Sequence, residues 1–211
     1  MAHQHQKKAN WLTHRGMVNI CSFCSPDEIS PLSFREAFTE YAHDNPIISE
    51  KESLIRAASS PDANVTLAIT TDGNIIGLAI LEYPRADERW VRVGKRVMAE
   101  VSVIEVSRPW RSTGIARELL HLLLDHPLKP DRIFYMVGYS WTWDLEGAGI
   151  PPVCYRDMMI RLFTPHGFKT YQTNEPNIML RPENLFMARI GENISESVRK
   201  RFKMIRFNID D

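Results

Sequence analysis

Residues 104–120 have the sequence Ile-Glu-Val-Ser-Arg-Pro-Trp-Arg-Ser-Thr-Gly-Ile-Ala-Arg-Glu-Leu-Leu. The apolar start of this stretch predicts a strand, and its apolar end predicts the first turns of a helix. Small residues at Gly114 and Ala116 let a ligand approach the backbone of the polar turn between them. The free N–H groups and the dipole at a helix start favour an anion, and Arg111 can add a charged hydrogen bond. The stretch therefore predicts a site for a pyrophosphate group.

The turn is not one of the common nucleotide-binding loops. It matches neither G-x-x-x-x-G-K-[ST] nor G-x-G-x-x-G, and most single-glycine turns of this kind bind nothing. A function for this turn must therefore be supported by features elsewhere in the chain.

Apolar periodicity predicts the elements on either side of this stretch. Strands are expected at residues 17–23, 64–71, 74–82, 99–106, 132–137, 168–172 and 185–190. Helices are expected in two or three pieces within 25–58, at 114–125, at 155–163 and, as a basic amphipathic helix, at the C-terminus. Three S-x-x-E capping boxes support the first helical region: Ser25/Glu28, Ser33/Glu36 and Ser49/Glu52. Asp72-Gly73 predicts a hairpin turn.

The order β-αα-βββ-α-β-α-ββ predicts an α/β (α+β) fold. We expect a mixed, mostly antiparallel sheet of about seven strands with helices on both faces. The chain has 211 residues, of which 44% are apolar. We expect a flexible N-terminal tail over 1–13 and a single domain over 14–211.

Charge and hydropathy exclude several classes of protein. Lys and Arg number 26 and Asp and Glu also number 26, so a chain-wide basic field for nucleic acid is absent. The sequence predicts neither a signal peptide nor a membrane helix, and we expect a cytoplasmic protein. Basic runs at 84–96 and 199–206 are interpreted as solvated faces.

The cysteine and histidine patterns predict no metal site. Cys21-Ser-Phe-Cys24 is a single C-x-x-C, which supplies two ligands where zinc usually needs four. We expect two half-buried thiols at the end of a strand, and no disulfide scaffold.

Residues 104–116 resemble the acetyl-CoA signature of the GNAT acetyltransferases, R/Q-x-x-G-x-G/A. Arg111, Gly114 and Ala116 lie on its defining positions. The resemblance implies the GNAT fold and acetyl-CoA as co-substrate. It implies that backbone groups of Ile104, Glu105 and Val106 bind the pantetheine arm. The pyrophosphate would be held by Arg111, Ser112, Thr113, Gly114, Ile115 and Ala116.

Two glutamates are candidates for the general base. Acetylation needs a neutral amine, and a carboxylate can accept the ammonium proton. Glu100 and Glu105 lie on one predicted strand and, by alternation, on opposite faces. Glu100 is preferred because it lies eleven residues before Arg111, the offset of the base in several protein-acetylating GNAT members. Alternatively Glu100 is a solvated or salt-bridged residue, and Glu105 is more consistent with a structural role.

The general acid of many GNAT enzymes is a tyrosine four residues before a Gly-Phe pair. Here the pair is Gly167-Phe168, and Phe163 occupies that position. Tyr155 is the substitute candidate; alternatively it is a core-facing aromatic. Thiolate departure needs no acid if the coenzyme thiol leaves unaided.

A narrower resemblance is to the acetoin-utilisation acetyltransferases, the AcuA proteins. Its pieces are residues 88–90, 139–147, 155–159, 174–176 and 187–191. The resemblance implies a protein lysine acetyltransferase that acetylates the active-site lysine of acetyl-CoA synthetase and inactivates it.

An aromatic loop at 139–149 suits such a protein partner. Trp141 and Trp143 could anchor it, and Asp144 could attract a lysine. Alternatively both tryptophans fill the core and Asp144 caps a turn. Two other functions stay open: acetylation of a small-molecule amine, and acyl-CoA binding without catalysis, with regulation by docking.

Overall fold

The computed structural model describes residues 5–34, 38 and 50–209. They divide into two compact units. Unit 1 comprises Met1–Glu82 and Ser102–His126, and unit 2 comprises Tyr83–Val101 and Pro127–Asp211. Strand β6 (Met98–Val106) contributes its first four residues to unit 2 and the remainder to unit 1. The expectation of one domain over 14–211 stays a prediction.

Unit 1 is built on a hairpin of two long buried strands. Strands β4 (Asn64–Thr70) and β5 (Asn74–Glu82) pair antiparallel across Asp72-Gly73, as predicted, and Gly73 has φ +80°. Outward from β4 lie β2 (Gly16–Cys21) and then β1 (Lys8–Thr13), both antiparallel to their neighbours. The short strand β3 (Ser33–Phe34) pairs parallel with β5. The Ser107 N–H donates to the Ile76 carbonyl at 2.9 Å and joins the end of β6 to β5.

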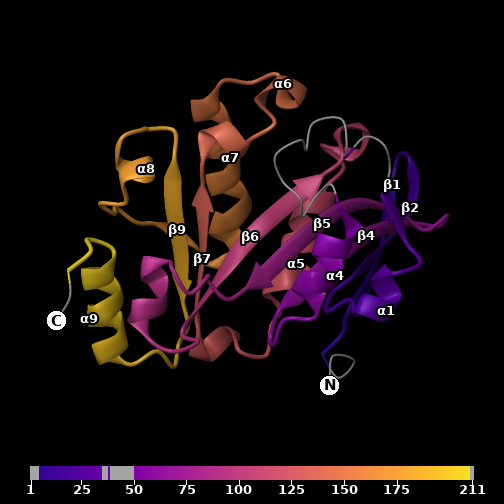
Figure 1. The fold of residues 1–211 in the computed structure, drawn as a ribbon. Helices are drawn as coiled ribbons and strands as arrows, with labels where there is room; N and C mark the ends of the chain where they lie inside the picture. The colour runs from indigo at the N-terminus through magenta and orange to yellow at the C-terminus, as the bar shows by residue number, and fades with distance from the viewer. Residues whose placement is uncertain (1–4, 35–37, 39–49, 210–211) are drawn as a thin grey trace. The chain divides into compact units, whose positions relative to one another are not determined.

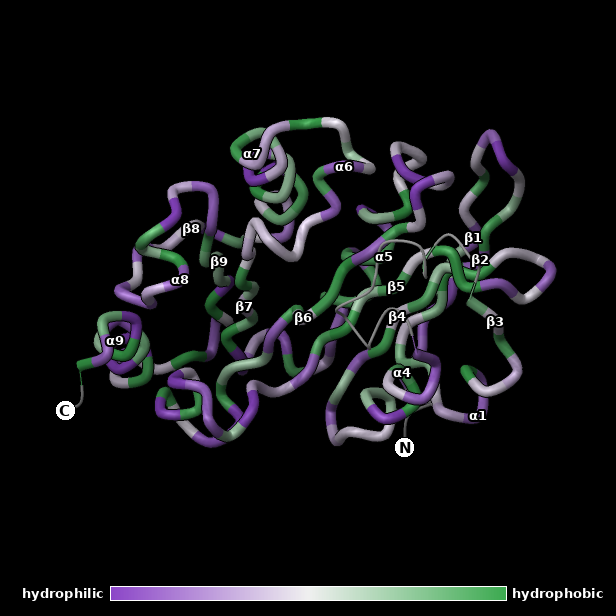
Figure 2. The backbone as a smooth tube through the Cα atoms, turned by 45° about the horizontal axis from the view of Figure 1, so that its top comes forward, coloured by the Kyte–Doolittle hydropathy of each residue, from purple (hydrophilic) through white to green (hydrophobic). Residues whose placement is uncertain are grey.

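Helices cover both faces of this part of the sheet, as expected. Helices α1 (Pro26–Ile29) and α4 (Lys51–Ala58) join one core, which includes Ile29, Leu54, Val65, Leu67 and Val103. Strand alternation turns the other side chains of β4 toward helix α5 (Ile115–Leu124). Figure 2 colours β4 and β5 largely as hydrophobic segments, in keeping with strands buried on both faces.

Small residues let α5 lie close to the sheet. A Cβ on Gly77 would come within 3.0 Å of Leu119 Cδ1 and 3.3 Å of Ile115 Cγ2, while Ala68 borders the same space. Asn64 on this face donates to the Leu123 carbonyl of α5 at 3.0 Å. The apolar face of α5 is thereby held against β4 and β5 (Figure 1).

Unit 2 has a central antiparallel pair, β7 (Ile133–Gly138) and β9 (Leu185–Ile190), which lie side by side in Figure 1. The start of β6 pairs parallel with β7, and β8 (Lys169–Thr170) pairs antiparallel with β9. One core joins these strands to the 3₁₀ helix η2 (Arg89–Val93) and to the C-terminal helix α9 (Glu196–Ile205). Trp90 stacks on Phe186 at a centroid distance of 4.5 Å in that core.

The remaining helices of unit 2 are α6 (Leu145–Ala148), α7 (Pro152–Phe163) and α8 (Pro176–Met179). Helix α7 buries Met159 and Phe163, and Phe163 meets Phe168 edge-on at 5.1 Å. Across the described part of the chain, no helix combines the length and apolar character that crossing a membrane requires.

Four expectations need correction or lie outside the described residues. Residues Lys8–Thr13, placed in the tail, form β1, because their alternate side chains pack inward while β2 supplies the hydrogen bonds. Nine strands rather than about seven are present in the described part of the chain, although the fold class is as predicted. Ser33, expected to cap a helix, lies in strand β3, whereas the Ser25/Glu28 capping box is present. Glu36 and Ser49 lie outside the described residues.

Candidate functional site

The predicted pyrophosphate turn connects β6 to α5 within unit 1. Ser112 and Gly114 both adopt left-handed backbone conformations, with φ of +62° and +87°. Gly114 is the N-cap of α5, and no described side chain makes a capping hydrogen bond there. The first N–H groups of the helix are therefore not used by a capping side chain. Consecutive N–H groups in such a turn form a concavity that suits an anion.

Arg111 is anchored to the end of β6. Its Nε donates to the Val106 carbonyl at 3.0 Å, and its Nη2 donates to Glu105 Oε1 at 2.9 Å. Glu105 Oε1 also accepts the Val106 N–H at 3.1 Å. These contacts match the structural role that was the alternative to a catalytic role for Glu105. A contact from Arg111 to a phosphate stays a prediction.

The other signature residues differ in exposure. Ile115 is buried in the core beneath the turn, Ile104 and Ala116 are partly buried, and Ser112 is exposed. Thr113 Oγ1 donates to the Trp110 carbonyl at 2.6 Å, which ties the turn to the preceding 3₁₀ helix η3 (Arg108–Trp110).

Glu100 lies in a cluster of acids and phenols in unit 2. It pairs in register with Tyr135 of β7. The Tyr135 hydroxyl lies 3.3 Å from a carboxylate oxygen of Glu100 and 3.3 Å from one of Glu88. Burial, then the charges of Glu100 and Glu88, raise the pKa of Tyr135 well above its ordinary value. The Tyr135 hydroxyl has one hydrogen, so it can donate to only one of the two carboxylates at a time.

Tyr139, just beyond the end of β7, belongs to the same cluster. Burial, followed by the charges of Glu175, Glu100 and Glu88, raises the pKa of Tyr139 to about 12. Three carboxylates therefore act on one phenol, and the positive charge of Arg89 opposes them. From the sequence, Glu88 and Tyr139 stood out only as parts of segments with a family resemblance, and Tyr135 did not stand out, because strand register brings these residues together.

Tyr155 stacks on Trp143, with ring centroids 4.9 Å apart and an interplanar angle of 15°. Both rings are partly buried, which matches the alternative of a packed aromatic for Tyr155. A Cβ on Gly138 would lie 3.0 Å from Trp143 Cζ2, so the absent side chain at Gly138 makes room for the indole.

Trp141 and Trp143, the two candidate anchors of the aromatic loop, differ in their exposure. Trp141 is 54% exposed and stacks on Tyr139 at 4.7 Å. The Arg181 guanidinium lies 5.6 Å from the Trp141 ring centroid. Asp144 is the N-cap of α6 and accepts the Gly147 N–H at 3.0 Å, as the capping alternative proposed.

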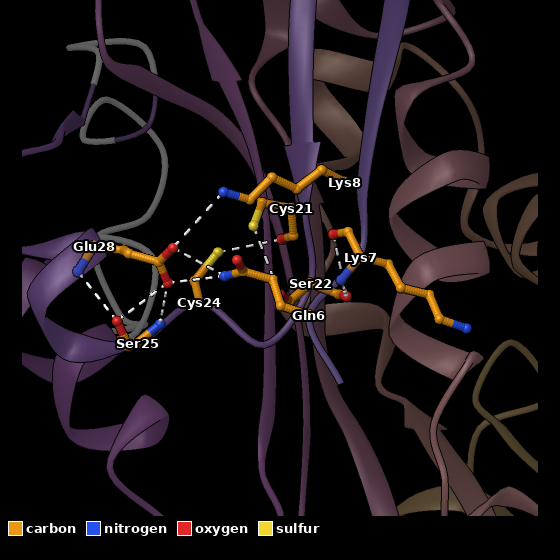
Figure 3. Close-up of polar contacts among 8 residues, drawn as sticks. All are labelled: Gln6, Lys7, Lys8, Cys21, Ser22, Cys24, Ser25 and Glu28. Atoms are coloured by element: carbon orange, nitrogen blue, oxygen red, sulfur yellow. Dashed lines mark hydrogen bonds and ion pairs between the residues drawn. The ribbon is translucent and has the colours of Figure 1, made fainter. Parts of the chain in front are cut away.

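The C-x-x-C pair forms a small polar cluster in unit 1, drawn in Figure 3. Both thiols are free and buried, deeper than the half-buried placement expected. Cys24 Sγ donates to the Cys21 carbonyl at 3.2 Å. Their mutual contact lowers the pKa of Cys21 and raises that of Cys24 well above its ordinary value. Glu28 accepts from Gln6 Nε2 at 2.9 Å and completes the capping box with Ser25, which fixes the chain just after the thiols.

Comparison with known proteins tests the resemblances. No protein-family model matches the chain. The acetoin utilization protein AcuA of Bacillus licheniformis is 29% identical over 196 residues, covering 93% of this chain and 91% of that protein. AcuA of Bacillus subtilis is 29% identical over 206 residues, covering 97% and 96%.

Solved structures agree. The acetoin utilization protein from Exiguobacterium sibiricum has a TM-score of 0.88 at 25% identity, covering 96% of this chain and 94% of that one. A histone acetyltransferase HPA2-related acetyltransferase from Corynebacterium glutamicum has a TM-score of 0.51 at 14% identity, covering 82% and 96%, which is a likeness of fold alone. The chain is thus related over almost its whole length to the acetoin utilization proteins AcuA, and it has the acetyltransferase fold that the GNAT resemblance predicted.

Proposed function

We propose that this GNAT-type acetyltransferase moves an acetyl group from acetyl-CoA to a lysine side chain of acetyl-CoA synthetase, in the cytoplasm, and thereby inactivates that enzyme. The relationship to AcuA and the acetyltransferase fold support the reaction class. The Glu88–Tyr135–Glu100 cluster is the observation that carries the proposal for an amine acceptor.

The turn between β6 and α5 suits binding of the acetyl donor, acetyl-CoA. Ser112 and Gly114 in this turn have left-handed backbone conformations, and no described side chain caps the start of α5. Both features favour binding of a pyrophosphate. Backbone groups of Ile104 and Glu105 would hold the pantetheine arm, whereas at Val106, the third candidate, the N–H already donates to Glu105 and the carbonyl already accepts from Arg111. When bound, acetyl-CoA supplies the thioester carbonyl that the amine attacks.

The acidic cluster suits the acceptor. A lysine reaches the enzyme as an ammonium ion, which has no lone pair, so its proton must leave before attack. Carboxylates attract the ammonium ion, and Glu100 accepts its proton. Tyr135 and Glu88 are positioning residues: the buried hydroxyl fixes Glu100, and Glu88 takes over that hydroxyl's hydrogen bond when Glu100 is protonated.

An exposed aromatic surface supports a protein acceptor over a small amine. Trp141 is exposed and rigidly stacked on Tyr139, and a rigid exposed tryptophan is a frequent anchor at protein interfaces. The Asp144 carboxylate caps helix α6, so the proposal does not depend on a direct contact between Asp144 and the lysine.

The test is to incubate the protein with acetyl-CoA and acetyl-CoA synthetase and to measure intact masses and synthetase activity. We expect one acetyl mass gain on the synthetase, on its active-site lysine by peptide mapping, together with loss of activity. Glu100→Gln should reduce the acetylation rate by about 10²- to 10⁴-fold, the usual contribution of a general base. Tyr135→Phe should reduce it by a smaller factor and shift the pH–rate profile.

Glu196→Gln is the matched control, since Glu196 is an exposed carboxylate of the same unit at the start of α9. It should leave the rate unchanged. Inhibition without a mass gain would replace the proposal with regulation by docking. Acetylation of a small amine, with the synthetase untouched, would assign the acceptor to the other class.

A further inference from the structure

Strand β1 and the residue just before it contact the two ends of helix α5. Lys7, just before β1, pairs with Asp125 just after the helix. Trp11 in the middle of β1 contacts Thr113, which lies just before the helix. Four strand residues span about 13 Å. The long Lys7 side chain extends that reach, so the two contacts lie near the two ends of α5.

The contact at the start of the helix is a hydrogen bond to the signature turn itself. Trp11 Nε1 donates to the Thr113 carbonyl at 2.9 Å. A trans peptide group is planar, with its C=O and N–H pointing in opposite directions. Holding the Thr113 carbonyl toward the indole therefore directs the Gly114 N–H to the opposite side of the turn.

Gly114 also makes room for the indole. A Cβ at this position would lie 2.9 Å from Trp11 Cζ2, which is closer than side chains approach. The ring thus lies directly on the glycine of the turn. Thr113 is held from the other side as well, through its hydroxyl and the Trp110 carbonyl.

We infer that Trp11 is a positioning residue for coenzyme binding: it fixes the peptide between Thr113 and Gly114 so that the N–H groups of the turn face the pyrophosphate. The inference rests on the proposed function, because it assumes that the turn binds acetyl-CoA. Trp11 acts through the backbone and needs no contact with the coenzyme.

Trp11→Phe tests this, because it keeps an aromatic ring and removes the donor. The dissociation constant of coenzyme A, measured by titration calorimetry, should rise about tenfold, as expected for weakening one hydrogen bond to a charged group. The kcat/KM for acetyl-CoA should fall by the same factor, because KM rises. The kcat/KM for S-acetylpantetheine, which lacks the pyrophosphate, should stay at the wild-type value.

Two further variants separate positioning from folding. Replacing Trp11 by benzothienylalanine keeps the ring shape and removes only the N–H, so it should weaken coenzyme A binding like Trp11→Phe. Leu12→Ala is the control, because Leu12 is the next residue of β1 and is 75% exposed; it should bind coenzyme A normally.

Unchanged coenzyme A affinity in both Trp11 variants would overturn the inference while leaving the proposed function intact. An equal loss with S-acetylpantetheine would also overturn it, since that result indicates general damage. A wild-type protein that does not bind coenzyme A would instead remove the proposed function.

Discussion

Arg111 Nη2 lies 2.9 Å from Glu105 Oε1, and this ion pair joins the start of the signature turn to the strand before it. The side chains are only 22% and 16% exposed, so water screens the pair weakly. The defining arginine of the signature thus has a structural partner in the protein itself.

Breaking this pair should loosen the turn. Glu105→Gln should lower the free energy of unfolding by about 1–3 kcal/mol, because the Arg111 guanidinium loses its charged acceptor in a partly buried setting. Urea unfolding measures the loss. The double variant Glu105→Gln/Arg111→Gln should cost less than the sum of the single variants; strict additivity would show that the two groups are not coupled.

Gly114 and Gly73 form a matched pair for a second prediction. Their φ values are +87° and +80°, but only Gly114 has an indole against the position of a Cβ. Gly73→Ala should cost about 1–2 kcal/mol from backbone strain alone. Gly114→Ala should cost about 2–4 kcal/mol, since the contact with Trp11 adds to the strain. Equal losses in thermal or urea unfolding would show that the indole does not contact the turn in solution.

Tyr139 should make the protein sensitive to alkali. Its pKa is about 12 in the folded state and 10 in the ordinary state, so the unfolded chain loses the phenol proton first. The stabilising contribution is complete below pH 10 and is lost as the pH rises from 10 to 12. Between these values the free energy of unfolding should fall more steeply in the wild type than in Tyr139→Phe. Parallel profiles would contradict the burial of this phenol and the carboxylates around it.

Trp141→Ala should separate protein from small-molecule acceptors. The side chain is 54% exposed, so its removal should change the free energy of unfolding by about 1 kcal/mol or less. The KM for the protein acceptor should rise about tenfold or more, as for an interface anchor, with kcat retained. Val153→Ala, at a position 52% exposed in the same unit, is the control and should have no effect. An unchanged KM in Trp141→Ala would remove this tryptophan from the acceptor surface.

Local patterns in the sequence determined much of the fold. Asp72-Gly73 specified the β4–β5 hairpin, Ser25 with Glu28 specified the start of α1, and the 3,4 spacing of leucines specified α5, because each depends on neighbours a few residues apart. The signature turn was predictable for the same reason. Strand β1 was not, since its six residues are half-exposed and become a strand only by pairing with β2.

The polar contacts of the site were decided by tertiary structure. Glu88 and Tyr135 are 47 residues apart, Tyr135 and Glu100 are 35 apart, and Trp11 and Thr113 are 102 apart. Strand register and helix packing bring these groups together, and neither is encoded by spacing along the chain. The sequence by itself determined most of the elements, the coenzyme signature and the candidate base. Only the folded chain decided which phenol contacts Glu100 and which indole contacts the turn, because those choices depend on long-range packing of the core.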